Sequence, residues 1–293
     1  MTDIVEAFRK CRKETDFYRI QIALENCLAP AEVAGLADRR IELPGPARAW
    51  LDQMLDRLFR EIGEPRPYTG LPLSEHVWFY GHAPDEPRRP DLLLAFCGNA
   101  QRLMMPVSVA LQHIESSRFD VVVFTDPARQ AYISGIKGYG ADAAAVLDRA
   151  GRDVNLAAYR SVRCLGTSGG GASALRAGCL LAAERAVCIG GRPIEEYGSL
   201  GKAAVKAAPA FNADFRRARG TDTRFICVYG AEHERDRIGA HHLAERLPAE
   251  LVPIPGVEQH NALFEILKEG RMGRFMDDLL LADAPAKAPS AVE

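Results

Sequence analysis

From residue 76 onward, short runs of apolar residues alternate with longer segments in which apolar residues recur at helical spacing. The runs DLLLAFC (91–97) and FDVVVF (119–124) are almost continuously apolar, which is typical of strands buried on both faces of a sheet. Strands that alternate with helices indicate βαβ units. We therefore predict an α/β fold class, with a mostly parallel central sheet and helices on both of its faces. The expected strands are 77–81, 92–97, 119–124, 162–166, 186–190, 224–229 and 251–254, and the expected helices are 106–116, 141–151, 172–184, 240–247 and 262–281.

The first 62 residues carry only the helical pattern. Apolar residues recur at helical spacing over residues 4–24 and again over residues 47–62, on either side of the helix-breaking Pro44-Gly45-Pro46. The aromatic and methionine stripe of the second run favours a core or an interface over a cofactor site. We expect this extension either to pack on the main domain or to form a homodimer through its helices. The stripe consists of Trp50, Leu51, Met54, Leu55, Leu58 and Phe59.

Two further changes in composition suggest where the chain divides. Residues 64–75 contain several prolines and are predicted to be a connector, and the end of the chain is rich in alanine and proline. The prediction is therefore a helical extension and linker (1–75), a catalytic domain (76–281) and a disordered tail (282–293).

Composition excludes several classes of function. A chain of 293 residues can hold one large α/β domain with an appendage, and its net charge of −2 argues against a role on nucleic acid or a membrane surface. There is no apolar run of about 20 residues, as a membrane span needs, and no secretory leader is visible, so we expect a cytoplasmic protein. The seven cysteines show no CxxC spacing, which favours small buried side chains in a reducing compartment over a zinc or other metal site.

The segment Val162–Glu184 reads as a strand, a sharp glycine-rich turn and a helix, with Ser168 at the apex of the turn. Residues 166–170, GTSGG, match the pattern G-x-S-x-G, in which the chain before and after the serine passes too close for a Cβ atom. A phosphate-binding glycine loop is the rival interpretation. It is weaker, because the glycines lack the order G-x-G-x-x-G and no Gly-Lys-Ser/Thr follows them.

A serine nucleophile needs a base, and His260 is the histidine best placed to serve. It lies on the loop after the last expected strand, and in a parallel sheet that loop shares an edge with Ser168. The loop after strand 224–229 offers three acids that could orient the imidazole: Glu232, Glu234 and Asp236. The histidines at 233, 241 and 242 are most simply surface residues.

Taken together, the elbow at Ser168, the segment YGAEHERDRIGAHHLAERLP and the loop LVPIPGVEQHNAL resemble the α/β-hydrolase superfamily. The resemblance covers residues 76–281 and implies the chain order nucleophile, acid, base. It implies that Asp236 is the acid, with Glu232, or Glu195 or Glu196 from an earlier loop, as alternatives. It also implies that the backbone N–H of Gly169 is one oxyanion donor, and that Asn99 or Ala100 supplies the second.

The resemblance implies a serine hydrolase that cleaves an ester or related acyl bond of a small molecule, without a cofactor or metal. Two alternatives stay open. One is a non-catalytic, hydrolase-like protein whose N-terminal helices bind a partner, because a fold does not guarantee activity. The other is an acyltransferase that uses the same serine with an acceptor other than water.

Overall fold

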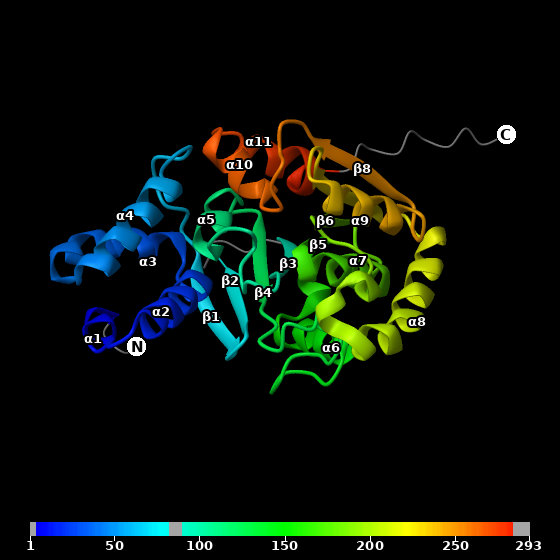
Figure 1. The fold of residues 1–293 in the computed structure, drawn as a ribbon, viewed down its shortest axis with the longest axis horizontal. Helices are drawn as coiled ribbons and strands as arrows, with labels where there is room; N and C mark the ends of the chain where they lie inside the picture. The colour runs from blue at the N-terminus through cyan, green and yellow to red at the C-terminus, as the bar shows by residue number, and fades with distance from the viewer. Residues whose placement is uncertain (1–3, 82–89, 284–293) are drawn as a thin grey trace.

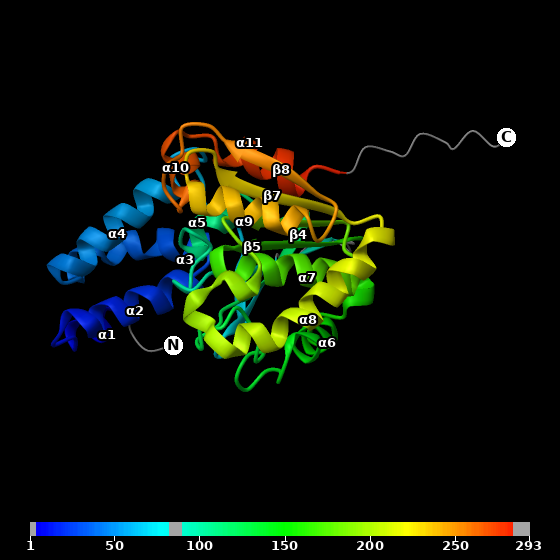
Figure 2. The ribbon, with the colours of Figure 1, turned by 45° about the vertical axis from the view of Figure 1, so that its right-hand side comes forward.

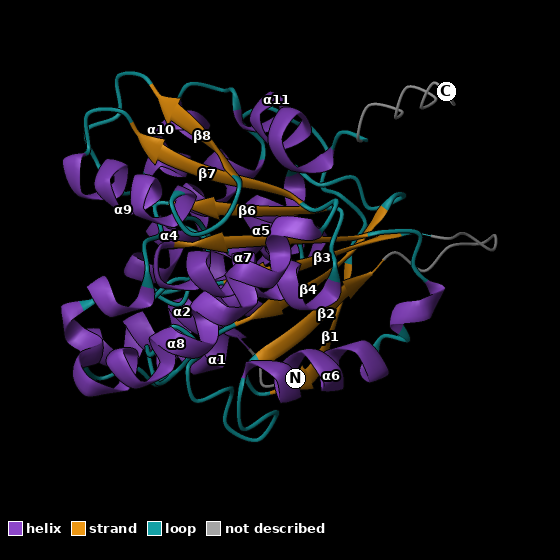
Figure 3. Cartoon of the chain, turned by 90° about the vertical axis from the view of Figure 1, so that its right-hand side faces the viewer, coloured by secondary structure: helices purple, strands orange, loops and turns teal. Residues whose placement is uncertain are grey.

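A computed structural model describes residues 4–81 and 90–283 of the chain. The described residues form one eight-stranded sheet in the order β1-β2-β4-β3-β5-β6-β7-β8 (Figures 1 and 3). β2 is antiparallel to both of its neighbours, and every other pair is parallel. The strands are β1 (Thr69–Ser74), β2 (Val77–Gly81), β3 (Asp91–Phe96), β4 (Phe119–Phe124), β5 (Val162–Thr167), β6 (Arg185–Ile189), β7 (Arg224–Gly230) and β8 (Ala249–Ile254).

The mostly parallel sheet predicted from the sequence is confirmed. Every residue of β3 and β4 is buried, because helices cover both faces of the sheet at these strands. The strands predicted at 77–81 and 119–124 have the predicted bounds, and the other five differ by one or two residues at an end.

Two hydrophobic clusters lie on opposite faces of the sheet. Alternate residues of the strands enter each cluster: Leu93 and Val121 belong to one, and Leu92 and Val122 to the other. The first face is covered by α5 (Val107–Gln112), α10 (Ala262–Lys268) and α11 (Met272–Met276), which continues as a π-helical turn (Asp277–Leu281). The second is covered by α6 (Ala143–Asp153), α7 (Gly171–Leu181), α8 (Gly201–Arg217) and α9 (Glu234–Ala244).

The N-terminal helices pack beside α5 on the first face, as Figures 1 and 2 show. Trp50, Leu51, Met54 and Leu58 are buried in the same cluster as the sheet residues of that face, so the predicted stripe belongs to the core. Homodimer formation through these helices stays a prediction. The elements are α1 (Ile4–Arg9), α2 (Glu14–Cys27), α3 (Pro30–Gly35), a 3₁₀ segment (Leu36–Glu42) and α4 (Gly45–Leu58).

Four expectations about the elements need correction. The connector predicted at 64–75 contains strand β1, which pairs with β2. The helix predicted at 262–281 divides at Gly270, whose φ of 65° ends the first part. Helix α9 begins at Glu234, six residues before its predicted start at 240, and α8 occupies a segment that had no predicted helix.

Other expectations concern the tail, the membrane and the cysteines. Most of the tail predicted to be disordered lies outside the described residues. Among the described helices, none combines the length and apolar character that crossing a membrane requires. All seven cysteines are free thiols, and Cys97, Cys164, Cys188 and Cys227 are buried.

Candidate active site

Ser168 lies at the turn between β5 and α7, in a backbone conformation that few residues other than glycine adopt. Its φ is 49°. A Cβ atom on Gly166 would lie 2.2 Å from the carbonyl oxygen of Gly170, and one on Gly170 would lie 2.4 Å from the carbonyl oxygen of Phe96. The two glycines are therefore required sterically, and the strained turn presents the serine side chain at the carboxyl edge of the sheet.

His260 contacts Ser168 directly. Its Nε2 lies 2.8 Å from Ser168 Oγ, within hydrogen-bonding distance. The ring comes from the loop between β8 and α10, and Asn261, the next residue, caps α10 by accepting the N–H of Phe264. Because β5 and β8 run in the same direction, their following loops meet at one edge, as the sequence predicted.

Asp236 contacts the other nitrogen of the same ring. Its Oδ2 lies 2.7 Å from His260 Nδ1, and the carboxylate is 2% exposed, whereas the His260 side chain is 40% exposed. The backbone joins the two loops, because Ala231 N–H donates to the carbonyl of Ile254 and Glu232 N–H to that of Val257. Two residues 24 positions apart are thereby held side by side.

The other candidate acids lie elsewhere. Glu232 and Glu234 are exposed, and among the described residues neither makes a hydrogen bond or ion pair with His260 through its side chain. Glu195 binds Arg246, which follows α9, and Glu196 binds His242 of α9 at 2.7 Å. The geometry thus places Asp236, and not the alternatives, beside the imidazole.

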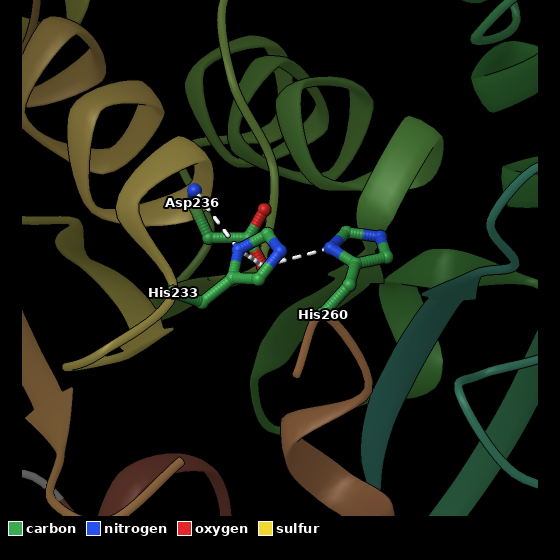
Figure 4. A group of neighbouring side chains, drawn as sticks. All are labelled: His233, Asp236 and His260. Carbon is green, nitrogen blue, oxygen red and sulfur yellow. Dashed lines mark hydrogen bonds and ion pairs between the residues drawn. The ribbon is translucent and has the colours of Figure 1, made fainter. Parts of the chain in front are cut away.

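His233 is part of this cluster, although the sequence suggested a surface residue. Its Nδ1 lies 3.2 Å from the backbone N of Asp236, whose N–H it accepts as the N-cap of α9, and 3.2 Å from Asp236 Oδ2. Its ring centre is 5.7 Å from that of His260 (Figure 4). Ligand atoms of the three side chains lie within 4.8 Å of one another, a span that a metal ion could also occupy. The sequence did hold a signal for this role of His233. It lies three residues before Asp236 at the start of a helix, which is the spacing between an N-cap residue and the backbone N–H that it accepts.

The predicted oxyanion donors flank Ser168. A Cβ atom on Gly98 would lie 3.0 Å from Ser168 Cβ, so the loop after β3 passes directly beside the serine. In the described part of the chain, neither the backbone N–H of Asn99 nor that of Gly169 donates to another protein group. A Cβ atom on Gly169 would lie 2.3 Å from Asn99 Oδ1, so the two predicted donor residues lie side by side next to Ser168.

The loop that carries Asn99 is joined to the N-terminal helices through a buried carboxylate. Gly98 N–H and the Thr167 hydroxyl both donate to the carbonyl of Arg102, which closes the loop. The Arg102 guanidinium donates to Glu25 of α2 at 2.5 Å, and Glu25, 1% exposed, also accepts from Trp50 Nε1 at 3.0 Å. The sequence did not indicate this connection, because the partners lie 77 residues apart.

Two further residues support the turn on its other side. The buried Tyr197 donates its hydroxyl to the backbone carbonyl of Ser168 at 2.7 Å, and burial raises the pKa of this phenol, so it remains a donor. Gly190 follows β6 with a φ of 61°, and a Cβ atom there would lie 3.0 Å from Asp236 Oδ2. The pair Gly190-Gly191 directly after a strand was the available signal for this close approach.

A cysteine nucleophile does not fit the site. Cys97 lies next to the Gly98 loop, but it is buried, and burial raises the pKa of its thiol well above the ordinary range. The reactive thiolate is therefore disfavoured at neutral pH. The Ser168 hydroxyl, by contrast, lies 2.8 Å from the imidazole of His260.

Comparison with known proteins identifies the fold. No protein-family model and no curated protein matches the sequence. Among solved structures, 2,6-dihydroxy-pseudo-oxynicotine hydrolase is 15% identical over 96% of this chain and 93% of its own, with a TM-score of 0.50. Est1E from Butyrivibrio proteoclasticus is 11% identical over 72% of this chain and 98% of its own, with a TM-score of 0.48. A metagenomic α/β hydrolase from lagoon sediments of Mar Chica, Morocco, is 16% identical over 72% and 98%, with a TM-score of 0.47. With its parallel sheet, strand order and full-length likeness to the first of these, the chain has the α/β-hydrolase fold.

Proposed function

We propose that this protein is a serine hydrolase that cleaves an ester or related acyl bond through an acyl-enzyme on Ser168. The observation that carries the proposal is the continuous path of hydrogen bonds from Asp236 through His260 to Ser168, with distances of 2.7 and 2.8 Å. A nucleophile, a base and an orienting acid in this order are the parts that acyl transfer to a serine requires.

In the first half-reaction, Ser168 Oγ bonds to the substrate carbonyl carbon while its proton passes to His260 Nε2. The carbonyl oxygen takes up the negative charge and is held by the backbone N–H groups of Gly169 and Asn99. The bond to the leaving alcohol then breaks, and His260 returns the proton to that alcohol. Asp236 accepts the Nδ1–H of His260 throughout, which holds the ring in the productive tautomer.

In the second half-reaction, water attacks the acyl carbon and His260 takes its proton. The acid product leaves and Ser168 recovers its hydrogen. An acyltransferase would use the same steps with an alcohol or amine in place of water. Product analysis with a competing alcohol distinguishes the two, because a transferase forms the new ester in preference to the acid.

The decisive test is covalent labelling with a fluorophosphonate, which reacts with activated serines. We expect one label per chain, on Ser168, and no label on Ser168→Ala. Ser134→Ala is the matched control, because Ser134 is an exposed serine whose hydroxyl donates to the side chain of Gln130. Stoichiometric labelling at another residue, with Ser168 unmodified, would contradict the proposal.

Asp236→Asn tests the orienting acid. We expect turnover to fall about 10³- to 10⁴-fold, because asparagine can stabilise the wrong tautomer and carries no charge. Glu234→Gln, an exposed acid two residues away, is the control and should retain full activity.

A chelator tests whether the cluster of His233, Asp236 and His260 holds a metal ion instead. We expect turnover to be unchanged by EDTA. Loss of activity on chelation, with recovery on adding Zn²⁺, would instead assign His233, Asp236 and His260 to a metal site.

A further inference from the structure

A cavity of about 840 Å³ lies between helix α2 and the ends of β2 and β4. Trp78 of β2 and Val123 of β4 line it from the sheet, and Tyr18, Ile22 and Ala23 line it from α2. Its volume is in the range that holds a drug-sized molecule.

Helix α2 has two apolar faces, and only one of them packs on the protein core. Phe17, Ile20 and Leu24 pack against the hydrophobic cluster of the first sheet face. Tyr18 and Ile22, one helical turn apart, line the cavity instead, and Tyr18 is 50% exposed. The second face therefore presents an aromatic and an aliphatic side chain to the cavity.

The cavity adjoins the candidate active site. Ala100 and Gln101 line it, and they directly follow Asn99 on the loop that passes beside Ser168. Gln101 is fixed there by a hydrogen bond from its Nε2 to the carbonyl of Asp126 at 2.5 Å. Thr125, which also lines the cavity, follows β4, so the cavity opens at the edge of the sheet where the catalytic loops meet.

We propose that this cavity binds a large neutral aromatic group of the ester that Ser168 cleaves, and that α2 thereby selects the substrate. Tyr18 and Trp78 line the cavity with aromatic side chains, which favour an aromatic group, although the Arg102 guanidinium lies over the Tyr18 ring, 5.9 Å from its centre. Charges of both signs, Glu14 and Glu75 with Arg19 and Arg129, line the same cavity, so it has no net preference for an anion or a cation. The proposal rests on the proposed function, since it assigns the specificity of the same serine.

The test fills the cavity from an exposed position. Ala23 is an exposed residue of α2 that lines the cavity, so Ala23→Trp is expected to fold normally and to occupy its space. Ala31→Trp is the matched control, because Ala31 is an exposed alanine on α3 outside the cavity. We expect Ala23→Trp to lower kcat/KM for 2-naphthyl acetate and phenyl benzoate by at least about tenfold. Ethyl acetate should be cleaved at the unchanged rate, and Ala31→Trp should match the wild type with all three.

A binding measurement separates this proposal from the catalytic one. The probe is 2-acetonaphthone, a neutral aromatic ketone that is not an ester, titrated calorimetrically into the Ser168→Ala protein. We expect binding that Ala23→Trp weakens at least about tenfold and Ala31→Trp leaves unchanged. If the ketone binds in this way but the wild type cleaves no ester, the cavity assignment stands and the proposed function fails.

Three results would overturn the cavity assignment while leaving the hydrolase intact. The first is an equal loss of activity on small and large esters in Ala23→Trp. The second is ketone binding that this substitution does not affect. The third is a dimer that Ala23→Trp, but not Ala31→Trp, dissociates, because the cavity would then hold a second copy of the chain.

Discussion

Asp91 and Glu25 are both buried carboxylates that bind arginine, but Asp91 lies at the amino edge of the sheet, whereas Glu25 of α2 binds a loop at the carboxyl edge. Asp91, 0% exposed, begins β3, and it accepts from Arg160 at 2.6 and 2.8 Å and from Arg118 at 3.1 Å. Arg118 directly precedes β4, and Arg160 lies two residues before β5. The hydrogen bonds of Asp91 therefore connect the starts of the three neighbouring strands β4, β3 and β5. Glu25 binds the loop that follows β3 and passes beside Ser168.

The comparison indicates that a buried carboxylate–arginine pair stabilises the fold at the amino edge of the sheet. At the carboxyl edge, the same kind of pair positions a loop of the candidate site. In an open parallel sheet the carboxyl edge holds the ligand, so an ion pair there can affect turnover. The amino edge holds no reacting group, and an ion pair there can only stabilise the fold. Three substitutions and one change of pH test this contrast.

The largest effect is expected from Asp91→Asn. The substitution removes the charge that faces Arg160, Arg118 and the fully buried Arg163, 3.9 Å away. We expect the free energy of unfolding to fall by on the order of 3 kcal/mol, the usual cost of breaking a buried ion pair. The melting temperature should then fall by about 5–10 °C. Turnover per fluorophosphonate-titrated site should not change, and a loss of turnover there would refute the contrast.

Glu25→Gln should have the next largest effect, and it should act on catalysis. Without the carboxylate charge, Arg102 no longer anchors the loop that carries Asn99. We expect kcat per titrated site to fall about tenfold to a hundredfold with little change in KM, because a donor is displaced from the oxyanion. Affinity for a trifluoromethyl ketone, whose adduct bears the same oxyanion, should fall in parallel. A lower melting temperature with unchanged kcat would mean that Glu25 only stabilises the fold.

Acid pH should weaken the Asp91 cluster in a predictable direction. Burial by itself raises the pKa of Asp91, but the hydrogen bonds from Arg160, Ser161 and Arg118 outweigh it, so its pKa in the folded protein is lowered. A carboxylate with a lowered pKa stabilises the fold above its ordinary pKa of about 3.9, and that contribution is lost as the pH falls through the folded value. Urea unfolding at a series of pH values should therefore show wild type and Asp91→Asn converging below about pH 4. A constant difference down to pH 3 would contradict this explanation.

Asp52→Asn should have the smallest effect of the four. Asp52 pairs with Arg40 in the same N-terminal extension as Glu25, but both side chains are 42% exposed. Water and salt screen such a pair, so we expect no measurable change in melting temperature or turnover. It is the control for Glu25→Gln, and an equal loss of turnover in both variants would show that any change in the extension impairs the site.

Much of the site could be predicted from local sequence. The glycines at 166 and 170 have no room for a Cβ atom, so the elbow is encoded within five residues. His260 could be placed because a loop after a parallel strand must lie at the edge where Ser168 lies. Asp236 was harder to assign, since α9 begins earlier than its hydrophobic pattern indicated and three acids stand close together at its start. The only local signal for His233 was its spacing from an acid at a helix start, and the hydrogen bond of Tyr197 to Ser168 had no local pattern.

Local sequence was enough to predict the α/β alternation, the buried strands and the strained serine turn, because each depends on periodicity or on steric limits within a few residues. The tertiary structure decided which acid meets His260, that β1 joins the sheet, and that α2 presents one face to the core and another to a cavity. It also decided that Glu25 binds Arg102. These features depend on side chains far apart in the chain, and hydrophobic patterning specifies that a residue is apolar or polar but not which distant group it meets.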